Sequence, residues 1–256
     1  MHVNNEWKNL VFNFDERRNY VVLKDQQHAV AFCVSHFLSL AKIAIETQGS
    51  FSVALSGGST PKAIFQSLAS AKESELIDWG KVKLFWSDER SVSPDHMDSN
   101  YHMAMEAGLK SLPFLPEHIY RMKAEKDIQD GALAYEKLIH EHVPESRFDF
   151  VMLGVGEDGH TASLFPNTHA LHTTDRLVVA NFVPEKETWR MTFTFDCINR
   201  AHHTAIYALG KSKANIVNQV LKGPYQPNHF PSQKVGTRAH PALWIMDAEA
   251  AALVDL

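Results

Sequence analysis

The chain has 256 residues, of which 45% are hydrophobic and 21% are charged, and its formal net charge is −5. This composition is ordinary for a globular protein, and the length is sufficient to bury a sizeable core. The weakly negative charge contains no long run of one sign, which argues against a broad basic surface for nucleic acid or anionic lipid. An anionic ligand would therefore have to be bound by a local group of residues.

The cysteines and histidines indicate neither a disulfide framework nor a metal site. Cys33 and Cys197 lie among apolar neighbours outside any Cys-x-x-Cys pattern, as expected for thiols in a reducing compartment. The close histidine pairs, 140/142 and 202/203, would point to different faces of a helix or strand. The N-terminal residues form no apolar signal segment, and no run of about 18 consecutive apolar residues is present. We therefore expect a cytoplasmic protein with no metal and no membrane association.

Taken in chain order, the first half of the chain predicts strands that alternate with helices. Asp25 is a candidate N-cap for a helix with helical apolar spacing, and Gly49 is a candidate stop for it. Ser59 or Thr60 as N-cap, with Pro61 in the first turn, predicts the start of the next helix. The strands predicted in this half are 20–24, 51–55 and 82–86, and further helices are expected at 99–109 and 128–142.

The second half continues the alternation. The apolar run that opens 148–166 is a predicted strand, as are 177–182, 191–195, 205–209 and 243–246. Helices are predicted at 211–221 and from Asp247 onward. Residues 223–241 hold four prolines and two glycines and are predicted as a loop. This order predicts one α/β domain over residues 1–256, with a mainly parallel sheet and helices on both faces. Ligands of such sheets bind at the carboxyl ends of the strands.

The first polar segment at a strand end is Ser56-Gly57-Gly58-Ser59-Thr60. Its glycines allow a sharp turn and close approach to a ligand, and the following helix offers free N–H groups and a positive dipole end. We therefore predict that these five residues bind a phosphate ester. The segment matches neither nucleotide-binding pattern, GxxxxGK[ST] or GxGxxG. An ordinary capped turn between strand and helix would also explain it.

The second segment is Ser87-Asp88-Glu89-Arg90, directly after the apolar strand 82–86. Three charged side chains at this position are suitably placed to contact a ligand. A solvated turn is the alternative interpretation.

The third segment is 148–166, where an apolar run breaks into glycines around Asp158 and His160. His160 is the candidate general base or acid, because imidazole titrates near neutral pH. Asp158 is a candidate to orient His160 or to act on the substrate. Backbone N–H groups beside the glycines are candidates to hold a developing oxyanion.

Two more basic residues become relevant if the ligand carries a phosphate. Arg190 precedes an alternating strand, and Lys211 begins a predicted helix. Because a cation at a helix N-terminus is disfavoured by the dipole, Lys211 is better explained if it meets an anion there. Both residues would otherwise be ordinary surface charges.

Several motifs together resemble the glucosamine-6-phosphate isomerase/6-phosphogluconolactonase family, and its lactonase members in particular. They are SGGSTPK at 56–62, SDER at 87–90 with DSNY at 98–101, GVGEDGHTASLFP at 154–166, RMT at 190–192, GKSKA at 210–214 and WIMD at 244–247. The resemblance extends over most of the chain from about residue 25. It implies a modified Rossmann-like α/β sheet and hydrolysis of 6-phospho-D-glucono-1,5-lactone without a metal or organic cofactor.

One position separates the lactonases from the deaminases of the same family. The deaminases have an Asn-Glu pair after their Asp-Gly-His motif, where this chain has Leu164 and Phe165. Leucine and phenylalanine cannot transfer protons, and Arg90 stands where the deaminases favour tyrosine. The resemblance therefore favours the lactonases. A glucosamine-6-phosphate deaminase, or a sugar-phosphate-binding protein without turnover, remains the alternative.

The resemblance also implies roles for the candidate residues. The phosphate would lie against 56–60, with Arg190 and Lys211 supplying charge and Asp88 contacting substrate. His160 would activate water, and Asp158 would orient either His160 or a sugar hydroxyl. Backbone N–H groups would stabilise the oxyanion, with Arg90 as a further candidate. We expect a monomer or weak homo-oligomer whose partner is a small sugar phosphate. Arg238 and His240 in the loop 223–241 could close over the site.

Overall fold

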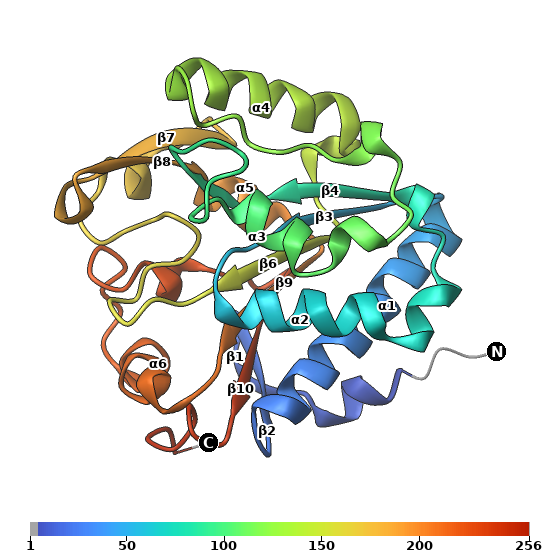
Figure 1. Cartoon of the computed structure of the whole chain (residues 1–256). Coiled ribbons are helices and arrows are strands. Elements are labelled where there is room, and N and C mark those ends of the chain that lie inside the picture. Colours follow the sequence, from blue (N-terminus) through green and yellow to red (C-terminus); the bar gives the residue numbers. More distant parts are fainter. Residues whose placement is uncertain (1–4, 256) are drawn as a thin grey trace.

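The computed structural model describes residues 5–255 and contains two β-sheets surrounded by helices (Figure 1). The larger sheet has seven strands in the order β1-β2-β10-β9-β6-β3-β4. All of its neighbouring pairs are parallel except β1 with β2. The predicted mainly parallel α/β fold is thus confirmed. The strands of this sheet are β1 Phe12–Asp15, β2 Arg18–Leu23, β3 Phe51–Leu55, β4 Val82–Trp86, β6 Phe150–Gly154, β9 His203–Ala208 and β10 Ala242–Asp247.

The smaller sheet is antiparallel and has three strands in the order β5-β8-β7. Its strands are β5 Asp88–Arg90, β7 Val178–Val183 and β8 Thr188–Phe193. The segment 88–90, for which a solvated turn was the alternative, is therefore a short and largely buried strand at the edge of this sheet. Its backbone pairs with β8, so Arg90 lies directly opposite Arg190.

Six α-helices accompany the sheets within the described chain, and α1 and α2 lie together on the opposite side of the molecule from α4 (Figure 1). Their bounds are α1 Gln26–Gln48, α2 Ser59–Ser70, α3 Asn100–Glu106, α4 Ile128–His142, α5 Phe195–Arg200 and α6 Ala214–Lys222. Asp25 caps α1 by accepting a hydrogen bond from the His28 N–H, and Gly49 ends it at φ 84°, as predicted.

Some predicted boundaries are wrong. No helix begins at Asp247, because this residue ends β10 and its carboxylate accepts hydrogen bonds from the N–H groups of Gly210 and Ala250. Only turns follow it. The helix predicted at 211–221 begins as a 3-10 turn, Lys211–Lys213, before α6. Strand β1 was not predicted, because it has only four residues and none of them is buried.

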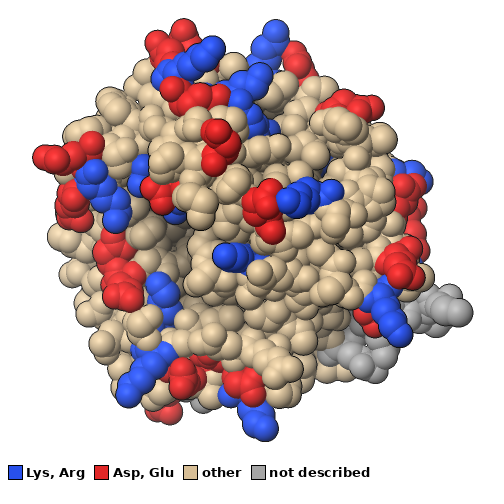
Figure 2. Space-filling view, in the orientation of Figure 1, with Lys and Arg blue, Asp and Glu red and all other residues tan. Residues whose placement is uncertain are grey.

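Among the described helices, α1 alone is long and apolar enough, by length and composition, to cross a membrane. Eleven of its residues are buried, and it packs against α2 and strands β2, β3 and β10. Its apolar residues are therefore part of the protein's own core. On the face shown in Figure 2, acidic and basic side chains are interspersed, with no large area of one sign.

Candidate active site

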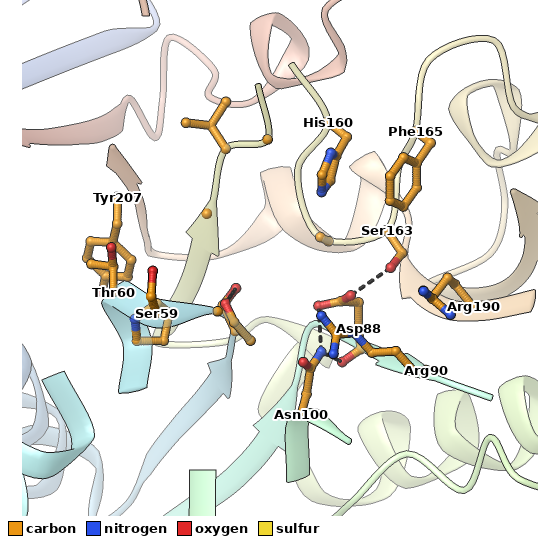
Figure 3. A pocket seen from close by; sticks show the side chains of 18 of the residues that line it. Ser59, Thr60, Asp88, Arg90, Asn100, His160, Ser163, Phe165, Arg190 and Tyr207 are labelled. Atoms are coloured by element: carbon orange, nitrogen blue, oxygen red, sulfur yellow. Dashed lines mark hydrogen bonds between the residues drawn. The ribbon is translucent and has the colours of Figure 1, made fainter. Parts of the chain in front are cut away.

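A cavity of about 300 Å³ lies at the carboxyl ends of β3, β6 and β9, beside β5 and β8 (Figure 3). This is the sheet edge at which ligands of parallel α/β folds bind. The residues that line it are Ser56, Gly57, Gly58, Ser59, Thr60, Pro61, Asp88, Arg90, Asn100, Gly154, Val155, Gly156, His160, Ala162, Ser163, Phe165, Lys186, Arg190, Tyr207 and Lys213.

The loop 56–60 forms one wall of the cavity. Helix α2 begins at Ser59, with Gly58 at φ 106° in the N-cap position and no side chain capping the first turn. The predicted cap was therefore one to two residues too late, because only glycine adopts this backbone conformation easily. The Ser59 and Thr60 hydroxyls do not cap the helix, and its first N–H groups stay available to an anion.

Gly57 brings this loop into contact with the next group of residues. A Cβ placed at Gly57 would lie 1.9 Å from Oδ1 of Asn100, so a larger residue would displace the Asn100 side chain. Asn100 in turn donates to the Asp88 carbonyl (2.9 Å) and to Asp88 Oδ1 (3.3 Å). The loop, Asn100 and Asp88 therefore form one connected wall.

His160 faces the cavity between two neighbours. Its Nδ1 lies 2.5 Å from Asp158 Oδ1, and its ring stacks on Phe165 with centroids 4.1 Å apart and an interplanar angle of 20°. Burial raises the pKa of Asp158, but the hydrogen bonds and charge of His160 leave this pKa below its usual value. Asp158 itself does not line the cavity. In this geometry the Asp158 carboxylate contacts His160 Nδ1, so Nε2 is the imidazole nitrogen that it does not engage.

The glycine at 156 is required by this arrangement. A Cβ at Gly156 would lie 2.1 Å from His160 Nδ1 and 2.4 Å from Asp158 Oδ1. The Gly156 N–H also donates to the His160 carbonyl at 2.9 Å, which closes the turn. Thr161 fixes the end of the turn by donating its hydroxyl to the Gly154 carbonyl at 2.8 Å.

Asp88 begins β5, two residues after β4 ends, and lines the cavity. It is 6% exposed and accepts a hydrogen bond from the Ser163 hydroxyl at 2.6 Å. The Ser163 N–H is held by Thr192 Oγ1 on β8 at 3.1 Å. Ser163 thus has a carboxylate partner but no histidine partner in the described contacts, which does not fit an activated nucleophile.

Glu89, the neighbour of Asp88, points away from the cavity. Its carboxylate accepts hydrogen bonds from the N–H groups of Arg90, Asn100 and Tyr101 and from the Ser99 hydroxyl, at 2.7–3.0 Å. Burial raises the pKa of Glu89 despite these bonds. Its role is to hold the start of α3, and so to place Asn100 beside Asp88.

Four cations reach the cavity: Arg90, Arg190, Lys186 and Lys213. Burial, then the charge of Arg90, lowers the pKa of Arg190, while nearby carboxylates oppose the change. Like charges directly opposite on paired strands destabilise a sheet, and a bound anion would relieve this repulsion. In Figure 3, Arg190 lies across the cavity from Ser59 and Thr60, and His160 lies above the space between them.

Most of the predicted site residues come together here, with two exceptions. Asp158 stays behind His160, and Lys211 is exposed outside the cavity. Lys211 and Lys213 occupy the same 3-10 turn, so residues two apart point in different directions, and only Lys213 lines the site. Arg238 pairs with Glu16, and His240 contacts Arg147, and neither lines the cavity.

Sequence reasoning missed five polar or charged lining residues that the structure adds. Asn100, Ser163 and Lys213 belong to quoted motifs, but nothing in the motifs shows which way they point. Lys186 lies in the turn between β7 and β8, and Tyr207 lies on β9. These two carry no local pattern and depend on tertiary structure alone. Within the described chain, no three His, Cys, Asp or Glu side chains gather as a potential metal site.

The fold and cavity define an α/β protein with a glycine-containing loop at a helix N-terminus, an Asp–His pair and converging cations. A family model described as glucosamine-6-phosphate isomerases/6-phosphogluconolactonase matches residues 24–244. A 6-phosphogluconolactonase from Chlamydia muridarum is 39% identical over 246 residues, 96% of this chain and 94% of that protein. The chain therefore belongs to the glucosamine-6-phosphate isomerase/6-phosphogluconolactonase family.

Two solved structures share this fold. The 6-phosphogluconolactonase from Trypanosoma cruzi has a TM-score of 0.81 at 26% identity, covering 96% of this chain and 99% of that one. A monomeric glucosamine-6-phosphate deaminase has a TM-score of 0.79 at 17% identity, covering 91% and 99% of the two chains. The second likeness shows the fold alone, so the two chemistries must be separated at the site.

Proposed function

We propose that the protein is a 6-phosphogluconolactonase, which hydrolyses 6-phospho-D-glucono-1,5-lactone to 6-phospho-D-gluconate in the oxidative pentose phosphate pathway. The observation that carries the proposal is the setting of His160, with Asp158 on one nitrogen and the Phe165 ring stacked on its face. A base supported by one carboxylate, in a cavity with an anion-binding loop, suits the attack of water on a phosphorylated lactone.

The reaction can be followed from these groups. Nε2 of His160 takes a proton from water as the water oxygen bonds to the lactone carbonyl carbon. Arg90 and backbone N–H groups of the segment 154–161 stabilise the oxyanion. The imidazolium, oriented by Asp158, returns the proton to the ring oxygen as the ester bond breaks. No protein nucleophile is needed, which agrees with the absence of a histidine beside Ser163 in its described contacts.

The substrate phosphate is assigned to the loop 56–60 together with Lys213, which takes the role first given to Lys211. Arg190 is the second candidate partner of the phosphate, since one guanidinium group can donate two parallel hydrogen bonds to phosphate oxygens. Asp88 is proposed to contact a sugar hydroxyl from the floor of the cavity. The chain is proposed to work as a single domain, in the cytoplasm, as a monomer or weak homo-oligomer without a cofactor.

A glucosamine-6-phosphate deaminase is the second candidate, because the fold is shared. That chemistry requires a proton-transferring group at the position of Phe165 or Leu164. Phe165 instead stacks on His160, and Leu164 is completely buried. This observation favours hydrolysis.

The deciding experiment measures both activities on one preparation. Hydrolysis of freshly generated 6-phosphogluconolactone is expected, with no ammonia released from glucosamine 6-phosphate. Ammonia release would overturn the proposal in favour of the deaminase. Binding of 6-phosphogluconate by calorimetry without turnover of either substrate would indicate a sugar-phosphate-binding protein.

A further inference from the structure

The loop after α6 packs against the segment that carries His160. The Ser232 N–H donates to the Gly159 carbonyl at 3.0 Å, and the Asn167 N–H donates to the Asn228 carbonyl at 3.0 Å. Two backbone hydrogen bonds thus join residues 228–232 to both ends of the turn 159–167. The loop predicted at 223–241 therefore supports the site from behind, outside the cavity lining.

Gly159 makes this contact very close. It has φ 82°, and a Cβ there would lie 2.9 Å from Cδ1 and 3.0 Å from Cα of Phe230. Gly159 separates Asp158 from His160 in the sequence. Any shift of Phe230 therefore acts directly on the backbone between the carboxylate and the imidazole that it orients.

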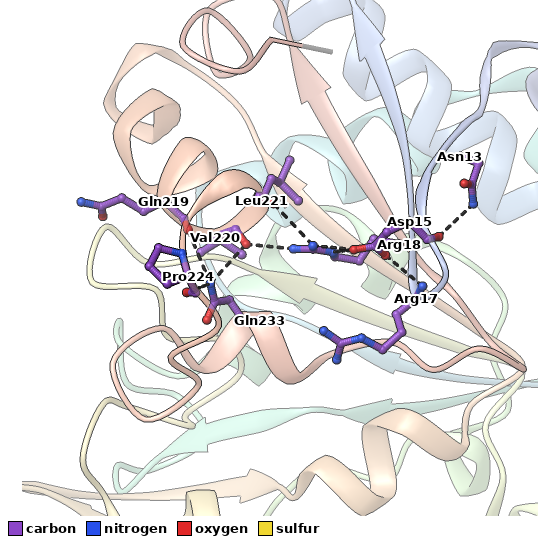
Figure 4. A network of polar contacts seen from close by, with 9 residues as sticks. All are labelled: Asn13, Asp15, Arg17, Arg18, Gln219, Val220, Leu221, Pro224 and Gln233. Carbon is purple, nitrogen blue, oxygen red and sulfur yellow. Dashed lines mark hydrogen bonds and ion pairs between the residues drawn. The ribbon is translucent and has the colours of Figure 1, made fainter.

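Gln233 fixes the shape of this loop (Figure 4). Its side chain is buried, at 2% exposed, and Oε1 accepts a hydrogen bond from the Gln226 N–H at 2.7 Å. Nε2 donates to the Pro224 carbonyl at 2.9 Å and lies 3.4 Å from the Val220 carbonyl at the end of α6. One amide thereby closes the loop onto the helix that precedes it.

The same helix reaches the cavity at its other end. Lys213 immediately precedes α6 and lines the cavity, and Cδ1 of Ile216 would lie 3.3 Å from a Cβ at Gly159. At the C-terminal end, Arg18 on β2 donates from Nη1 to the Val220 carbonyl at 2.8 Å, while Asp15 holds its guanidinium (Figure 4). Helix α6 is therefore anchored to the main sheet.

We propose that Gln233 and Phe230 are positioning residues for His160, acting through the Gly159 backbone. The inference rests on the proposed function, in which His160 is the general base. Loss of the Gln233 amide frees the loop 224–232, and Phe230 no longer holds Gly159. His160 then loses its alignment with Asp158 and with the attacking water, and chemistry slows more than binding weakens.

The test compares four variants with the wild-type chain. Gln233→Met keeps the size of the side chain but removes its hydrogen bonds, and Phe230→Ala removes the packing on Gly159. Phe230→Leu is the conservative rescue. Gln48→Met is the matched control, since it removes a glutamine hydrogen bond to Asp149 on another part of the molecule. The readouts are kcat and KM with 6-phosphogluconolactone, and amide hydrogen exchange of residues 156–168.

Gln233→Met and Phe230→Ala are expected to lower kcat about tenfold while KM changes less than about threefold. Exchange of residues 156–168 should accelerate in both, whereas Phe230→Leu and Gln48→Met should resemble wild type there. Unchanged kcat, or exchange that rises equally throughout the chain, would overturn the proposal. If Gln233→Met does not fold, Phe230→Ala tests the same contact with the Gln233 hydrogen bonds intact. Absence of lactonase activity in the wild type would refute the proposed function, while the exchange comparison would still decide whether the loop holds the turn.

Discussion

The two ends of the parallel strands in the main sheet use their polar residues in opposite ways. At the carboxyl ends, the loop 56–60 and the turn 154–160 open into the cavity, with N–H groups and an imidazole facing it. At the amino ends, the Asp149 carboxylate accepts hydrogen bonds from the Ser52 N–H (2.7 Å) and hydroxyl (2.8 Å). His36 is 2% exposed among aromatic rings.

This difference separates ligand binding from stability within one sheet. Those groups at the carboxyl ends that line the cavity face the space where a ligand would bind, so changing them should alter kinetics more than folding. Groups at the amino ends are buried or bonded within the protein, so changing them should alter stability more than kinetics. The smaller sheet belongs with the carboxyl ends in this comparison, because its residues Arg90 and Arg190 line the cavity.

The largest effect is expected from His160→Ala. Loss of general base catalysis should lower kcat by roughly 10²- to 10⁴-fold, measured at saturating 6-phosphogluconolactone. The melting temperature should change little, because the His160 side chain is 28% exposed and its removal opens no sealed cavity. A variant that turns over at nearly the wild-type rate would remove His160 from the mechanism.

A smaller effect, mainly on KM, is expected from the cavity cations. Arg190→Ala and Lys213→Ala each remove a charged partner of an anion, which should raise KM by roughly 10- to 100-fold. Lys211→Ala is the matched control from the same 3-10 turn and should stay within about twofold, since Lys211 is exposed outside the cavity. Steady-state kinetics with the phosphorylated and unphosphorylated lactones would show which cation discriminates between them. If Lys211→Ala weakens binding as strongly as Lys213→Ala, the assignment of Lys213 is wrong.

The order of strands and helices in the main sheet could be predicted because each element has its own local pattern. Apolar runs such as Phe51–Leu55 and caps such as Asp25 depend on neighbouring residues alone. Strands at 177–182 and 191–195 were predicted, but not that they form a second sheet with 88–90, because β5 and β8 are about a hundred residues apart and pair only through tertiary structure. The prediction of Lys211, where the structure brings Lys213 to the cavity, has the same origin. The motif contains both lysines, and only the 3-10 turn decides which one reaches the cavity.

The smallest effect on catalysis, and a clear one on stability, is expected from His36→Phe at the other end of the sheet. The centroid of the His36 ring lies 4.5 Å from that of Trp7 and 5.3 Å from that of Phe150, and its Nδ1 has no hydrogen-bond partner among the described residues. Burial, with a smaller contribution from the charge of His203, lowers the pKa of His36 to about 3. Because the unfolded chain binds this proton near pH 6.5, the stability contributed by neutral His36 is complete above that pH. It is lost as the pH falls toward 3, by about 1.4 kcal/mol per pH unit.

His36→Phe should therefore flatten the fall in unfolding free energy measured with urea between pH 7 and pH 5, and leave kcat at pH 7 unchanged. The exposed His172, changed to Phe as a control, should leave the acid dependence as steep as in the wild type. An equally steep dependence in His36→Phe would mean that the amino ends of the strands do not set the acid stability of the fold.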